Sequence, residues 1–188
     1  RATEYGPAGM AAIIQSPGLE NAAEADRFAM IDDELRQSWK EQGGEGAWRA
    51  PLLKLRPKLR YLGFDASEYA VARHGRRRNL HLARFADFEF LRPCPPADLL
   101  VCSDVLHYLP TRELQRGLPA LAELCGGVAF IEAFAREDEA VGDDHEFKSR
   151  PAAFYTTRLR ALGLHPLGSH CWLSPARVEA ASALELPG

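Results

Sequence analysis

Long apolar runs are absent from the 188-residue sequence, and its first residues lack a charged-then-apolar leader. The first absence argues against a membrane-spanning segment. Together they lead us to expect a cytoplasmic protein with no membrane partner. The length suits a single domain over residues 1–188 and leaves little room for a second core. Apolar residues make up 46% of the chain and charged residues 26%, which is typical of globular proteins.

Cysteine is scarce, and its spacing lacks the close local pairs that a zinc site needs. The four residues, Cys94, Cys102, Cys125 and Cys171, lie far apart along the chain. A disulfide framework is typical of smaller secreted chains. We therefore expect reduced, mostly buried thiols and no bound metal.

Positive charge is also in deficit, since the formal net charge is -3. No chain-wide field attracts phosphate backbones, so we expect no nucleic-acid partner. The densest basic cluster joins Arg73 to Arg76, Arg77 and Arg78. It fits either an anion-binding patch or a solvated helix end whose cations suit the helix dipole. We favour the helix end, because no aromatic residues are interleaved with the arginines.

Strand-like and helical patterns alternate after residue 50. Strands are expected over 59–64, 80–85, 98–103 and 128–134, helices over 67–74, 111–125 and 151–162, an extended stretch over 164–173, and an edge strand over 180–186. This order predicts an α/β fold, a doubly wound, mostly parallel sheet with helices on both faces. Residues 1–42 are expected to form an N-terminal helical arm or lid. The arm is irregular over 1–20, with at most a short helix at 10–15, and an amphipathic helix starts near Asn21.

The strand that should precede the glycine cluster Gly43-Gly44-Glu45-Gly46 is missing. A doubly wound sheet places its nucleotide-binding glycines directly after its first strand. Here the glycines follow the polar end of the amphipathic helix. We hypothesise that the intact protein holds a further segment of about ten residues, the length of a strand with its turns. This segment would be inserted between Gln42 and Gly44.

Four features with cofactor-binding chemistry follow one another in a fixed order. The first is the glycine loop at 44–46, where a backbone can pass close to a ligand. Asp65 lies nineteen residues after Gly46, the spacing at which an acid reaches the hydroxyls of a ribose. Asp87 and Phe88 offer a carboxylate and an aromatic face to an adenine ring. The buried strand 98–103 then opens at the sheet edge where such folds bind ligands.

Taken in order, these segments resemble the motifs of class I S-adenosylmethionine-dependent methyltransferases. The resemblance spans about residues 44–173. It rests on Gly-Glu-Gly at 44–46, Tyr-Leu-Gly-Phe-Asp-Ala-Ser at 61–67, Ala-Asp-Phe at 86–88, Asp-Leu-Leu-Val-Cys-Ser-Asp-Val-Leu-His-Tyr-Leu at 98–109 and the turn before 128–131. It implies a sheet of about seven strands with the last one antiparallel, and S-adenosylmethionine as the cofactor.

The resemblance also implies a role for each cofactor-binding residue. The glycine loop would lie against the methionine part, Asp65 would bind the ribose hydroxyls, and the adenine would lie beside Ala66. The adenine amino group would donate to Asp87, and the backbone N–H of Phe88 would donate to the ring. The full set is Gly44, Glu45, Gly46, Asp65, Ala66, Asp87, Phe88, Cys102 and Ser103, with the last two facing the methionine amine.

The size and charge of the chain favour a small-molecule acceptor, methylated on oxygen or nitrogen by in-line transfer. A sulfonium donor is already activated, so the protein mainly aligns the acceptor and excludes water. His107 is the candidate general base, and its alternative is a structural histidine bonded to the backbone. Tyr108 either lines the acceptor pocket or covers the following helix.

Two other functions fit parts of the pattern. A nicotinamide-dependent oxidoreductase uses a similar glycine and acid arrangement, but it favours a third glycine where Arg49 follows Trp48. It also leaves Asp87 unexplained. A non-catalytic cofactor-binding module with a methyltransferase fold would keep the glycine loop and Asp65 without turnover.

Overall fold

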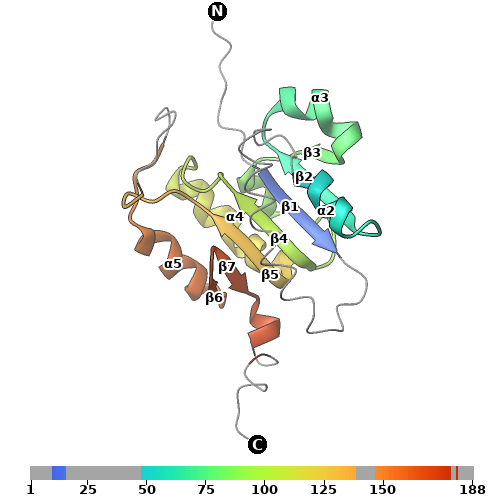
Figure 1. Cartoon of the computed structure of the whole chain (residues 1–188). Coiled ribbons are helices and arrows are strands. Elements are labelled where there is room, and N and C mark those ends of the chain that lie inside the picture. Colours follow the sequence, from blue (N-terminus) through green and yellow to red (C-terminus); the bar gives the residue numbers. More distant parts are fainter. Residues whose placement is uncertain (1–9, 16–47, 139–146, 179–180, 182–188) are drawn as a thin grey trace, which may run out of the picture.

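The computed structural model describes residues 10–15, 48–138, 147–178 and 181, which form one mixed sheet with helices packed against it (Figure 1). The sheet has seven strands in the order β3-β2-β1-β4-β5-β7-β6. The strands are β1 (Met10–Gln15), β2 (Arg60–Asp65), β3 (Leu80–Leu82), β4 (Ala97–Ser103), β5 (Cys125–Glu132), β6 (His165–Gly168) and β7 (Cys171–Leu173). The helices are α2 (Arg49–Leu55), α3 (Glu68–Arg78), the 3-10 helix η2 (Phe85–Glu89), α4 (Thr111–Leu124) and α5 (Ala152–Ala161).

Strand direction confirms the α/β class and corrects the expected pairing. β2 pairs with β3, and β4 with β5, in parallel. β1 is antiparallel to β2 and β4, and β7 is antiparallel to β5 and β6. Most of the described strands therefore point one way, although only two of the six pairings are parallel. The edge strand expected over 180–186 lies outside the described residues, apart from residue 181.

The central strand β1 contradicts the expected irregular arm or short helix over residues 10–15. Its register places Met10 opposite both Asp65 and Ser103. Pairing on both sides satisfies backbone groups of β2 and β4 that would otherwise be unpaired inside the sheet. This tertiary pairing outweighs the local sequence pattern that predicts an irregular arm or a short helix. The sheet position that a doubly wound fold gives to its first parallel strand is thus held by an antiparallel one. Residues 16–47, which include the glycine cluster and the segment expected to form an amphipathic helix, lie outside the described residues.

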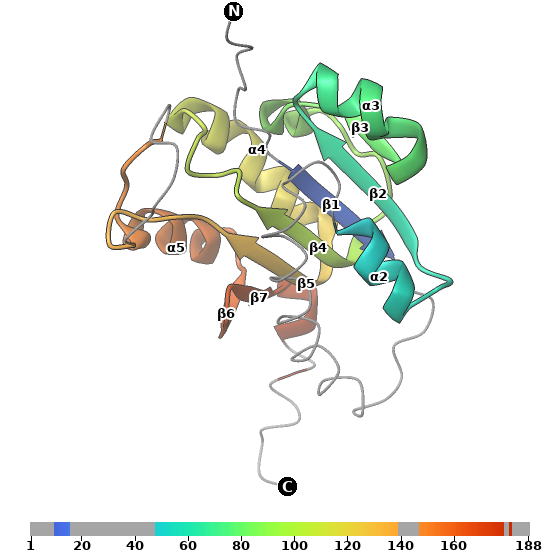
Figure 2. The ribbon, with the colours of Figure 1, turned by 45° about the horizontal axis from the view of Figure 1, so that its top comes forward.

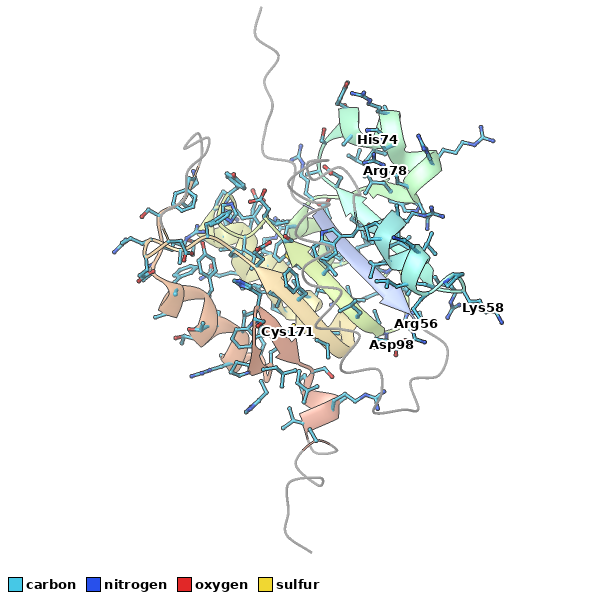
Figure 3. The ribbon with its side chains drawn as sticks, viewed as in Figure 1. Arg56, Lys58, His74, Arg78, Asp98 and Cys171 are labelled. Atoms are coloured by element: carbon cyan, nitrogen blue, oxygen red, sulfur yellow. The ribbon has the colours of Figure 1, made fainter. Side chains whose placement is uncertain are left out.

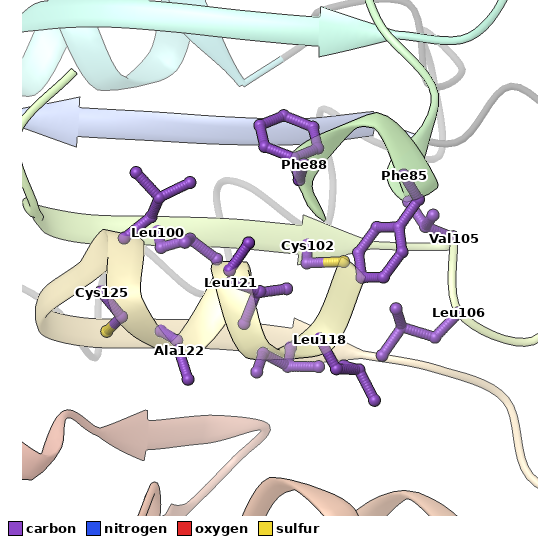
Figure 4. Close-up of a cluster of buried hydrophobic side chains, with 14 of the residues drawn as sticks. Phe85, Phe88, Leu100, Cys102, Val105, Leu106, Leu118, Leu121, Ala122 and Cys125 are labelled. Atoms are coloured by element: carbon purple, nitrogen blue, oxygen red, sulfur yellow. The ribbon is translucent and has the colours of Figure 1, made fainter. Parts of the chain in front are cut away.

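The two faces of the sheet carry two separate cores. The larger core lies between the sheet and η2, α4 and α5 (Figure 4). The smaller core lies under α2 and joins Trp48, Leu52, Tyr61, Val101 and Phe130. Strand β4 contributes alternate side chains to each core, as the two-residue period of a strand requires. Helices therefore cover both faces, with α2 on the face opposite α4 (Figure 2).

Helix α4 approaches η2 closely at Gly117. A Cβ atom there would collide with the ring and carbonyl oxygen of Phe85. This contact fixes η2, and with it Asp87, against the larger core. No helix in the described part of the chain is long and apolar enough to cross a membrane.

Candidate functional site at the carboxyl ends of β2 and β4

Asp65 ends β2 and is fully buried. Its Oδ1 accepts a hydrogen bond of 2.8 Å from the backbone N–H of Ser67. The Ser67 hydroxyl oxygen in turn accepts from the N–H of Ala70 at 3.1 Å, as an N-cap of α3. The carboxylate is therefore oriented by the turn that follows β2, while Ala66 beside it is exposed.

Ser103 ends β4 and joins it to the end of β5. Its hydroxyl donates to Oε2 of Glu132 at 2.6 Å, and Ser103 is 1% exposed. Cys102 before it is fully buried in the larger core, and burial raises the pKa of its thiol to about 12. Only the backbone of Cys102 is thus available to a ligand. Sequence reasoning missed Glu132, which could have been found as an acid at the end of the fifth strand.

Asp104 follows β4 in the left-handed backbone region, with a φ of 59°. Non-glycine residues adopt this conformation rarely and at a cost in energy, and such residues concentrate at functional sites. The N–H of Asp104 donates to the Glu132 carbonyl at 3.2 Å, and its Oδ1 lies 3.0 Å from Nε2 of His107. The surroundings therefore hold this backbone geometry. Sequence reasoning missed Asp104 as well.

His107 is fully buried under the loop that follows β4. Its Nδ1 accepts from the backbone N–H of Phe134 at 3.2 Å, and its Nε2 lies 3.0 Å from Oδ1 of Asp104. The ring packs between Tyr108, Phe134 and Phe147, at centroid distances of 4.2, 5.2 and 5.6 Å. This geometry supports the structural interpretation of His107 over the general-base one. Tyr108 is half-buried against the His107 ring.

Arg150 fixes the loop that carries Asp104 and His107. It is 9% exposed and donates to the carbonyl oxygens of Leu106 at 3.3 Å and Leu109 at 2.6 Å. It also donates to Thr111 Oγ1 at 3.2 Å and lies over the Phe154 ring at 4.9 Å. The loop after β4 is therefore tied to the start of α5.

The Asp87–Phe88 pair lies on η2, with the side chain of Asp87 exposed and that of Phe88 buried. Asp87 is exposed, and its Oδ2 accepts from the N–H of Arg84 at 2.8 Å. Phe88 is buried in the larger core (Figure 4), and its ring packs edge-on against that of Phe64 at a centroid distance of 5.1 Å. The aromatic face expected for an adenine ring is thus part of the core. The Asp87 carboxylate lies at the surface of this turn.

The sheet brings these groups to one edge. Because Met10 pairs with both Asp65 and Ser103, the ends of β2 and β4 flank the same end of β1. In a doubly wound sheet this edge is where ligands bind. Gly44, Glu45 and Gly46 lie outside the described residues. Within the described residues, no group of three His, Cys, Asp or Glu side chains could hold a metal ion.

Comparison with known proteins gives one solved structure of the same architecture. Magnesium protoporphyrin IX methyltransferase from Synechocystis PCC 6803, solved with bound SAH, matches with a TM-score of 0.52. The match covers 85% of this chain and 90% of that chain at 16% sequence identity. The chain has the class I methyltransferase fold. No family model and no curated protein matches the sequence.

Within this methyltransferase fold the cysteines are free thiols, as the sequence predicts. Cys102 and Cys125 are buried, and burial raises the pKa of Cys125 to about 11. Cys94 and Cys171 are half-buried, and burial also raises the pKa of Cys94. No thiol with a raised pKa is suited to nucleophilic chemistry near neutral pH.

A cavity of about 290 Å³ lies between α5 and the turn that joins β6 to β7. Its walls are mostly apolar, and include Leu106 from the loop after β4 and Ala133 next to Glu132. Cys171, labelled in Figure 3, and His170 line the opposite wall. Sequence reasoning could not find this cavity, because α5 and the β6–β7 turn meet only in the folded chain.

Proposed function

We propose that the chain is an S-adenosylmethionine-dependent methyltransferase acting on a small-molecule acceptor. The observation that carries the proposal is Asp65, a buried acid oriented by backbone hydrogen bonding at the end of β2 in a class I methyltransferase fold. In dinucleotide-binding sheets an acid in this place accepts from ribose hydroxyls. The SAH bound to the structural neighbour supports the same cofactor class.

We assign the cofactor to the edge between the ends of β2 and β4. Asp65 would hold the ribose and Ala66 would lie beside the adenine, whose amino group would donate to Asp87. The Phe88 N–H would complete the adenine contacts. The methionine end would contact the Cys102 carbonyl, Ser103 and the loop at 44–46. When bound, the cofactor supplies an activated methyl group.

The acceptor would enter from the side of β5. The cavity beside Glu132 is close in size to small-molecule sites and mostly apolar, which suits a compact acceptor. The partly exposed Asp104 carboxylate would accept a proton or a hydrogen bond from an acceptor oxygen or nitrogen. His107 would act as a positioning residue that orients this carboxylate. Tyr108 would lie at the mouth of the site.

Transfer of a labelled methyl group tests the proposal. The protein is incubated with methyl-labelled S-adenosylmethionine and a fractionated metabolite extract, and the labelled product is identified. We expect one labelled small molecule, in proportion to the S-adenosylhomocysteine released. Cofactor binding without any labelled product would favour the non-catalytic module. Oxidation of NADH by the same extract would favour the oxidoreductase.

A further inference from the structure

Basic residues are concentrated in one part of the chain despite the negative total. Residues 49–84 hold ten of the 23 lysines and arginines and only two of the 26 acids. The remaining residues therefore carry 13 basic and 24 acidic side chains. This segment forms α2, β2, α3 and β3. One half of the sheet is thus strongly basic within an acidic protein.

The fold brings two separate basic clusters of this segment together. The first is on α2 and the turn after it, and the second is on the last turn of α3 (Figure 3). Asn79, which caps α3, donates from Nδ2 to the carbonyl oxygen of Tyr61 at 2.6 Å, next to Arg60. The last turn of α3 therefore lies beside Arg60, which follows the turn after α2.

Six exposed side chains define this surface, which we call the basic face: Lys54, Lys58, Arg60, Arg73, Arg76 and Arg77. Within the described part of the chain, none of the six forms an ion pair with a carboxylate. Arg73 precedes Arg76 by three residues and Arg77 by four, and like charges at these spacings destabilise a helix. An anion bound at this face would remove that repulsion.

We propose that the basic face binds the phosphate backbone of a nucleic acid. Arginine dominates the face, and its planar guanidinium matches phosphate oxygens in a bidentate geometry. Tyr69, one turn before Arg73, is 55% exposed, and the Arg73 guanidinium lies 5.8 Å from its ring centroid. An exposed ring among arginines offers a stacking surface for a base.

This inference reverses the expectation drawn from the sequence, which rested on net charge and on the lack of interleaved aromatics. The fold separates the charges in space and places Tyr69 beside the arginines. The face is distinct from the proposed acceptor site, which lies at the ends of β4 and β5. Its test is therefore independent of methyl transfer.

Fluorescence anisotropy with labelled oligo(dT) of about 20 nucleotides tests the proposal, because single-strand sites span several nucleotides. The double variant Arg76→Glu/Arg77→Glu is compared with Arg112→Glu/Arg160→Glu, which makes the same charge change on exposed residues of α4 and α5. We expect wild-type binding at about 50 mM salt that weakens steeply toward about 200 mM. The α3 variant should lose at least about tenfold in affinity, and the control about twofold at most.

Circular dichroism establishes that each variant is folded, and Lys54→Glu/Lys58→Glu repeats the test away from α3. Three results would overturn the proposal: no binding by the wild type at about 50 mM salt, equal losses in the α3 variant and the control, or competition by poly-L-glutamate as effective as by unlabelled oligo(dT). The last result would assign the face to acidic proteins instead.

Discussion

At the scale of single residues, Asp65 links the turn after β2 to the proposed cofactor site. Asp65→Asn keeps an oxygen for the Ser67 N–H, whereas Asp65→Ala removes it. We expect Ala to lower the free energy of unfolding by about 1 kcal/mol more than Asn, which is the value of a typical hydrogen bond. Urea denaturation measures this difference. Both variants should weaken S-adenosylhomocysteine binding, and tight binding that survives both would refute the ribose assignment.

His107 is expected to act through structure. His107→Phe keeps a buried ring but leaves the Phe134 N–H without its acceptor. Loss of a typical hydrogen bond costs about 0.5–1.5 kcal/mol, so the free energy of unfolding should fall by that amount. Chemical denaturation at neutral pH provides the measurement. A variant as stable as the wild type, yet without methyl transfer, would instead support the general-base role.

The buried thiols give a defined pH dependence. Burial raises the pKa of Cys102 from 9.0 to about 12 and that of Cys125 to about 11. Above pH 9.0 the unfolded chain loses these protons while the folded chain retains them, so stability should fall as pH rises beyond that value. Thermal unfolding across this range checks the sign. In the Cys102→Ala variant, stability should fall less steeply with rising pH. An unchanged slope of stability against pH would contradict the raised pKa of Cys102.

At the scale of elements, β1 joins the two halves of the sheet, because it pairs with β2 on one side and with β4 on the other. Ala12 pairs with Gly63 on one side and with Val101 on the other. Ala12→Pro removes an N–H from a central strand, so we expect it to lower the free energy of unfolding by about 2 kcal/mol or more. Ala12→Gly keeps the N–H and should cost about 1 kcal/mol at most. If the proline variant were as stable as the wild type, the placement of β1 between β2 and β4 would be contradicted.

That outcome would favour the segment hypothesised before Gly44. The central position of the sheet would then belong to a parallel strand leading directly into the glycine loop. A peptide map of the intact protein decides the matter. Contiguous Gln42 and Gly43-Gly44-Glu45 would refute the hypothesis, whereas an intervening peptide rich in β-branched residues would establish it.

Elements with strong local sequence signals were predictable, and those made by distant pairing were not. The expected helices over 111–125 and 151–162 match α4 and α5 closely, because the glycines that follow them, Gly126 and Gly163, indicate where each helix ends. The expected strand over 80–85 is only Leu80–Leu82, since the chain turns into η2 at Phe85. Asp65 could be found by its spacing from the glycines. Asp104 could not be predicted, because its positive φ angle and its contact with His107 form only when the chain folds.

At the scale of the whole molecule, the fold separates the proposed cofactor edge, the cavity beside β5 and the basic face. The proposed cofactor edge lies at the ends of β2 and β4 and the cavity lies beside the end of β5, while the basic face covers α2 and α3. The structural match at 16% identity establishes the architecture that relates these sites. The chemistry proposed for each site rests on this chain's own residues.

Isothermal titration calorimetry with S-adenosylhomocysteine tests the central claim most directly. We expect one site with a dissociation constant of roughly 1–100 μM, an affinity sufficient for a cofactor product. NADH, titrated under the same conditions, should give no binding heat. Saturable binding of NADH with no response to S-adenosylhomocysteine would contradict the assignment of this protein to methyl transfer.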